Sequence, residues 1–106
     1  MTDLLNDTYM RLVSDFIVDP VVALKESRGF GSGGLTVHGK LFAVQRGDAL
    51  LLKLPARRVA ELISSEVGMP FDANKGRAMR EWILIKGTEA ATWPALAREA
   101  LTFVGG

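Results

Sequence analysis

The sequence has 106 residues and no cysteine, with 48% hydrophobic residues, 24% charged residues and a net charge of +1. This length is that of one domain, and we predict a single domain over residues 1–106. Without cysteine, disulfides, thiol catalysis and thiolate metal sites are excluded. The composition is that of a folded globular protein and not of a disordered chain.

The N-terminal stretch MTDLLNDTYM lacks the basic start and the apolar run of a secretory signal. The longest apolar runs span only a handful of residues, far short of the ~20 that a membrane span needs. We therefore expect a cytoplasmic protein that has no membrane partner.

Charge is spread unevenly along the chain. Residues 1–21 carry one Arg against four Asp, residues 22–58 carry seven Lys or Arg against two acids, and the remainder sums to −1. A basic middle segment can attract an anionic partner, although nucleic-acid-binding proteins usually show a stronger basic footprint. A solvated surface with a local charge bias is the simpler interpretation.

The first predicted element is a helix, because its apolar residues recur every three or four positions. The predicted buried stripe consists of Leu5, Tyr9, Leu12, Val13, Phe16 and Ile17. Asp19-Pro20 ends the helix, since the residue before a proline avoids the helical region. Residues 21–24 then predict a short strand.

Three further strands follow, over Leu35–Val37, Lys40–Gln45 and Ala49–Leu54, and short turns at His38-Gly39 and Arg46-Gly47-Asp48 join them. Glycine in each turn supplies the positive φ that tight hairpins require. Strands joined by such turns pair antiparallel.

These strands do not alternate cleanly between apolar and polar residues, as a half-solvated antiparallel strand would. The runs Leu41–Val44 and Leu50–Leu52 are apolar at successive positions. We therefore expect both faces of the sheet to be covered, one by helices and the other by a helix or by a second chain.

Pro55 suits the first residue of a second helix. The predicted buried stripe of this helix is Val59, Leu62, Ile63 and Val67. Gly68 and Pro70 are typical of a helix end, and they predict that the helix stops there.

A loop is expected over Phe71–Met79, a strand over Arg80–Lys86, and a last helix that begins near Thr92 as its cap. The fold class that follows is α+β, with two layers. An antiparallel meander sheet has N-terminal, middle and C-terminal helices packed on it.

Gly29, Gly31 and Gly34 match G-x-G-x-x-G, a pattern that can bind a pyrophosphate. A dinucleotide site needs this pattern between a strand and a helix, so that the helix N-terminus meets the phosphates. Here Leu35–Val37 favours a strand immediately after Gly34. We interpret the glycines as a bend that leads the chain into the sheet, and we expect no nucleotide cofactor.

The other residue patterns that could indicate catalysis give no support for an active site. His38 is the only histidine and falls in a tight turn, so neither a nucleophilic triad nor a zinc site is supported. The acid pairs Asp3/Asp7 and Asp15/Asp19 lie one helical turn apart, which is typical of solvent-facing carboxylates. We predict no catalytic residues, no metal and no cofactor, and thus no enzyme.

Several stretches resemble the TfoX N-terminal domain family. They are GFGSGGLTVHGKLFAV at residues 29–44, LLLKLP, PFD at residues 70–72, GRAMREWILI at residues 76–85 and the ending WPALAREALTFVG. The strand pattern is also similar to that of YjbR-like proteins. The resemblance implies a two-layer α+β fold and a regulatory role associated with competence-gene transcription. It brings no catalytic residues with it.

Two functions therefore stay open. The first is a non-enzymatic regulatory or interaction module that contacts another protein or forms a homodimer through its apolar sheet. The alternative is a module that binds nucleic acid or a small anion. Its candidate contacts are the basic residues Arg28, Lys40, Lys53, Arg57, Arg58, Lys75, Arg77 and Arg80.

Overall fold

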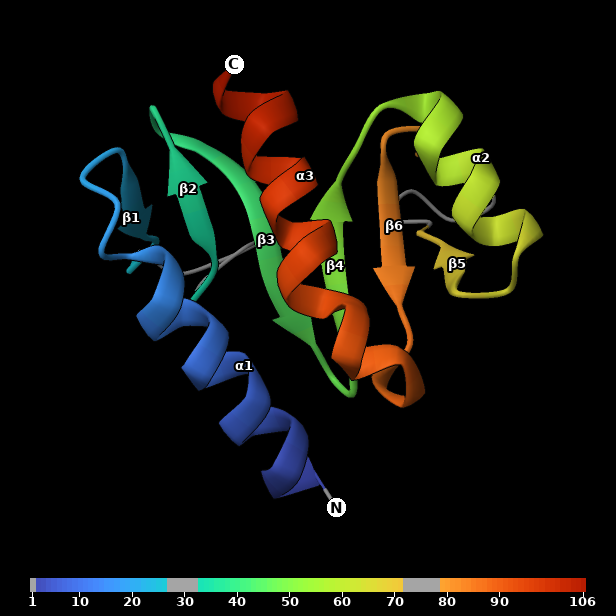
Figure 1. Cartoon of the computed structure of the whole chain (residues 1–106), viewed down its shortest axis with the longest axis horizontal. Coiled ribbons are helices and arrows are strands. Elements are labelled where there is room, and N and C mark those ends of the chain that lie inside the picture. Colours follow the sequence, from blue (N-terminus) through green and yellow to red (C-terminus); the bar gives the residue numbers. More distant parts are fainter. Residues whose placement is uncertain (1, 27–32, 72–78) are drawn as a thin grey trace.

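The computed structural model describes residues 2–26, 33–71 and 79–106, and places six strands in one antiparallel sheet with three α-helices (Figure 1). The strand order is β1-β2-β3-β4-β6-β5. The elements are α1 (Thr2–Phe16), β1 (Val22–Leu24), β2 (Leu35–Val37), β3 (Lys40–Arg46), β4 (Ala49–Lys53), α2 (Ala56–Ser64), β5 (Gly68–Pro70), β6 (Trp82–Ile85), the 3-10 helix η1 (Gly87–Thr92) and α3 (Trp93–Gly105). This arrangement confirms the α+β class and the N-terminal, middle and C-terminal helices.

Helix α1 buries the predicted stripe with one exception. Tyr9, Leu12, Val13 and Phe16 are buried, whereas Ile17 is 45% exposed. The helix ends at Phe16, whose carbonyl accepts a hydrogen bond from the Asp19 amide at 3.1 Å. This tight turn directs Ile17 toward solvent, so its predicted burial was wrong. The Leu5 side chain lies outside the described part of the chain.

Short turns connect the central strands as expected, although Arg46, which was predicted in the second turn, is the last residue of β3. His38 and Gly39 have φ values of +53° and +78° and join β2 to β3. Gly47, with φ +60°, begins the turn between β3 and β4. Positive φ, at both residues of the first turn and at Gly47 in the second, matches the right-handed twist of the paired strands and explains the glycines at these positions.

Strand β3 contains a bulge that the sequence did not reveal. Leu35 pairs with Ala43 and Thr36 pairs with Leu41, so Phe42 is an extra residue on β3. Phe42 and Ala43 are consecutive, yet both are fully buried in the helix-covered core. The centroids of the Phe42 and Phe16 rings are 6.2 Å apart. The bulge therefore explains part of the missing alternation.

The predicted end of the middle helix was wrong. Helix α2 ends at Ser64, and Gly68–Pro70 form an edge strand, β5, that pairs with β6. A proline is tolerated there because an edge strand leaves one side unpaired. Strand β6 lies between β4 and β5, so the sheet is not a simple meander.

The start of α3 also differs from the prediction. The chain first forms the 3-10 helix η1, and α3 follows at Trp93. Thr92 does not cap α3 through its side chain, because its hydroxyl donates a hydrogen bond back to the Glu89 carbonyl at 2.7 Å. The Trp93 ring is fully buried, and its indole N–H donates to the Lys86 carbonyl at 3.3 Å.

The two sheet faces are covered differently. Helices α1 and α3 lie across one face (Figure 1), where they complete the main core with side chains of β2, β3, β4 and β6. The opposite face carries a smaller cluster made by Val44, Leu51, Phe71 and Trp82. Among the described residues no helix covers this second face. The prediction of a helix layer is thus confirmed for one face only.

A substitution at Gly68 can test the close packing of β5 against β6. A Cβ atom on Gly68 would lie 2.5 Å from Ile83 Cδ1, which is a steric clash inside the core. We expect Gly68→Ala to lower the free energy of unfolding by about 1–3 kcal/mol in urea titrations. Ile83→Val removes Cδ1 but keeps Cγ1, which would lie 2.8 Å from the added Cβ, so the same substitution should cost less in that background without becoming neutral. An equal cost in both backgrounds would contradict this packing.

Candidate functional site

The described members of the predicted basic set gather at one end of the sheet. Lys40 begins β3, Lys53 ends β4, and Arg57 and Arg58 lie in the first turn of α2. Arg80 precedes β6, whose first residue, Trp82, pairs with Lys53. The sheet register therefore brings these cations to the same end, which is the upper end in Figure 1. Arg28, Lys75 and Arg77 lie outside the described residues.

Two of these cations are engaged in ion pairs. Arg58 holds Glu99 with two hydrogen bonds, from Nε to Oε1 at 2.9 Å and from Nη2 to Oε2 at 3.2 Å. A third bond, from Nη1, reaches Glu61 at 3.2 Å. The hydrogen bonds to Glu99 raise the pKa of Arg58 above its usual value. Arg58 thus joins α2 to α3 and is not presented to an outside anion.

Lys53 is engaged as well. Its Nζ lies 3.7 Å from Glu81 Oε1 and 5.4 Å from the centre of the Trp82 ring. Lys40, Arg57 and Arg80 are exposed and have no ion-pair partner within the described part of the chain. The sheet end is therefore a mixture of paired and solvent-facing charges.

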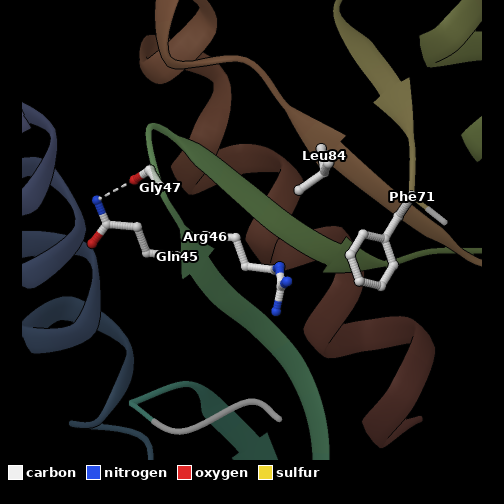
Figure 2. Close-up of a pocket in the computed structure, with 5 residues that line it drawn as sticks. All are labelled: Gln45, Arg46, Gly47, Phe71 and Leu84. Carbon is white, nitrogen blue, oxygen red and sulfur yellow. Dashed lines mark hydrogen bonds between the residues drawn. The ribbon is translucent and has the colours of Figure 1, made fainter. Parts of the chain in front are cut away.

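An open hollow of about 610 Å³ lies at the other end of the sheet, beside the β3–β4 turn (Figure 2). Figure 2 shows the Arg46 side chain directed toward Phe71, and the guanidinium carbon lies 5.2 Å from the ring centre. Gln45 points the other way, where its amide donates to the carbonyl of Gly47 at 3.2 Å. A cation held over an aromatic ring stabilises the Phe71 position.

Sequence reasoning missed this hollow. Phe71 and Arg46 are 25 positions apart, and no spacing rule joins them. The sequence could only have indicated that Arg46 follows an apolar run into a turn.

The glycine-rich stretch leads into a strand. β2 starts at Leu35, directly after Gly34, so the chain enters a strand and not a helix at this point, as predicted. Gly29 and Gly31 lie outside the described residues. The end of the stretch is held by Tyr9, whose hydroxyl donates to the Gly33 carbonyl at 2.7 Å. Burial raises the pKa of Tyr9 to about 12. A backbone hydrogen bond at Gln45 lowers this pKa by a smaller amount.

His38 lies exposed in the β2–β3 turn, as predicted. Over residues 2–26, 33–71 and 79–106, no three His, Asp or Glu side chains are grouped so that they could hold a metal ion. Nor does any helix in those ranges have the length and apolar character required to cross a bilayer.

The most apolar exposed surface lies where α1 turns into β1. We call residues 17–24 the apolar corner. Seven of these eight residues are apolar, and Ile17, Val18, Pro20, Val21, Ala23 and Leu24 are all exposed. Val18 is 80% exposed, more than any other large hydrophobic residue in the described ranges. Strand β1 forms one edge of the sheet, and its outer side pairs with no other strand of the described residues.

Comparisons with known protein families, with curated proteins and with solved structures found no match for this chain. The resemblance to the TfoX N-terminal domain family therefore stays a prediction.

Tyr9 is the only tyrosine, so its titration can be followed directly. Because its pKa is raised from 10 to about 12 in the folded protein, the folded state holds the phenolic proton more tightly than the unfolded state. The contribution of this tighter proton binding to the free energy of unfolding is fully present below pH 10, and it is lost as the pH rises toward 12. It amounts to about 2–3 kcal/mol.

We expect the free energy of unfolding to fall more steeply over this pH range in the natural protein than in Tyr9→Phe. At neutral pH, Tyr9→Phe should cost about 1 kcal/mol through loss of the bond to Gly33. Urea titrations at a series of pH values, with tyrosinate absorbance followed in parallel, measure both effects. A phenol that titrates near pH 10 in the folded protein would contradict the burial of Tyr9.

Proposed function

We propose that this protein is a non-enzymatic interaction module that self-associates through the apolar corner. The observation that carries the proposal is the concentration of exposed apolar side chains in residues 17–24. Single exposed apolar residues are normal on protein surfaces, whereas contiguous apolar patches mark interaction sites. An edge strand adds backbone groups that another strand can pair with.

A second copy of the chain fits this surface by charge. The corner has an acid, Asp19, near its start, and Lys25 follows its last residue. When two copies of the corner meet about a two-fold axis, the end of one copy that carries Asp19 faces the end of the other copy that carries Lys25. A two-fold contact of this kind is self-complementary, as homodimer interfaces require. The net charge of +1 sets up little repulsion between copies.

The dimer through the sheet face, expected from the apolar strands, is a weaker proposal. The residues that suggested it are already covered within the chain, since Leu51 is fully buried and Val44 is 4% exposed. Burial that folding has already achieved cannot drive association. The corner is preferred because its apolar side chains are still exposed.

Binding of nucleic acid or a small anion is the alternative function. It is less well supported because Arg58 and Lys53 are held by acidic side chains of the same chain. We expect no retardation of DNA or RNA in gel-shift assays even at low ionic strength. Retardation that falls steeply with added salt would support the alternative instead.

Sedimentation velocity over micromolar to millimolar protein concentrations tests the proposed dimer. We expect the natural chain to show a concentration-dependent dimer, and Val18→Glu to remain a monomer because it places a charge in the apolar corner. Met69→Glu is the matched control, since Met69 is also an exposed apolar residue but lies on β5 at the opposite edge of the sheet. A natural chain that stays monomeric throughout would refute the proposal.

A charge exchange tests the two-fold arrangement. Asp19→Lys and Lys25→Asp should each weaken the dimer, because each places like charges opposite one another. The double variant should recover dimerisation, since it restores opposite charges in the reversed order. Thermal unfolding checks that each variant is folded, because Asp19 also accepts a hydrogen bond from the Val21 amide. Failure of the double variant to recover would leave a dimer of different geometry.

A further inference from the structure

A second surface lies near the opposite edge of the sheet, in a groove beside α2. The helix lines this groove with Ala56, Val59, Ala60 and Ile63, which recur at helical spacing along one side. The alanines are short, so the helix surface is hollowed between the larger Val59 and Ile63. The groove encloses about 310 Å³.

The other wall of the groove is also apolar. Pro70 at the end of β5, together with Met79 and Trp82, faces the helix across it. The Trp82 side chain is held in place, since it is only 8% exposed and Lys53 lies over its ring. This wall therefore consists of a well-packed aromatic ring and not of an exposed, mobile one.

Arg80 is the single charged residue among the described residues that line the groove. It is exposed and forms no ion pair in the described ranges, unlike its neighbour Glu81, which holds Lys53. A guanidinium group recognises a carboxylate through two parallel hydrogen bonds. The groove thus offers an apolar channel with one anion-binding group, and none of the described residues that line it is an acid.

From this combination we infer that the groove binds a small amphipathic monocarboxylate, such as a medium-chain fatty acid. Its hydrocarbon tail lies between α2 and Trp82, and its carboxylate meets Arg80. The volume is at the lower end of small-molecule sites, which suits one short chain and not a large cofactor. Burial of the tail supplies the attraction, and the arginine supplies the preference for an acid over a neutral analogue.

This site is independent of the proposed dimer, because the groove contacts β5 and β1 forms the opposite edge of the sheet. Val18→Glu should therefore bind the acid as well as the natural chain does. Failure of one proposal leaves the other standing, and the two sets of measurements distinguish them.

Tryptophan fluorescence provides the test. Trp82 lines the groove, whereas Trp93 is fully buried elsewhere in the core and supplies a constant background. Octanoate, kept below its micelle concentration, should change the emission saturably. Octanol has a similar tail but no charge, and it should bind roughly tenfold more weakly or worse. Equal binding of octanoate and octanol would overturn the role of Arg80.

Variants locate the site. Arg80→Gln should lose roughly tenfold or more in octanoate affinity and leave octanol unchanged. Arg57→Gln is the matched control, because Arg57 is also exposed but does not line the groove. Ala60→Phe fills the channel and should weaken both ligands. If that variant fails to fold, Arg80→Gln and the comparison with octanol still show whether octanoate binds in the groove through Arg80. No saturable change with octanoate, or unaltered affinity in Arg80→Gln, would overturn the inference.

Discussion

Strand β4 is buried on both of its faces, and most of the architecture follows from covering it. Leu50, Leu51 and Leu52 are consecutive and fully buried, so they cannot all point to one side of a strand. Leu50 and Leu52 belong to the main core beneath the helices, and Leu51 belongs to the smaller cluster with Phe71 and Trp82. A central strand of this kind is stable only when both sheet faces exclude water.

The main core therefore gathers elements from the whole chain. Helix α1 contributes Phe16 near its end, α2 contributes Val59 and Leu62, and α3 contributes the fully buried Trp93. The bulge at Phe42 adds a large side chain to the same core. Polar contacts then orient the helices, as with the Arg58–Glu99 pair between α2 and α3. These pairs are partly exposed, so apolar burial supplies most of the stability.

Both proposals concern surfaces that folding leaves uncovered. The apolar corner is exposed because α1 ends at Phe16 and the turn carries the next residues away from the core. The groove exists because small alanines on α2 face a proline and a large aromatic ring. In the first case seven of the eight residues are apolar, which suits a matching copy. In the second, Arg80 adds one charge, which suits a ligand with an apolar tail and an acidic head.

The sequence alone determined the class of the fold, because hydrophobic periodicity and turn glycines are local signals. They were sufficient for α1, for β2 to β4 with their turns, and for the strand that follows Gly34 in place of a phosphate-binding helix. Strand β5 was missed because Gly68 and Pro70 are typical of a helix end. Their strand role depends on pairing with Ile83 and its neighbours, which come later in the chain.

The sheet register places the described cations at one end of the sheet, but it does not decide whether they are free to meet an anion. Arg58 is satisfied by Glu99, 41 positions away, and only the packing of α2 near α3 brings the two together. The groove beside Arg80 likewise brings together α2 and Trp82, and the exposure of the corner follows from the turn after Phe16. Local patterns decide which elements form. The surfaces left for binding depend on contacts between residues far apart in the chain, which no local pattern encodes.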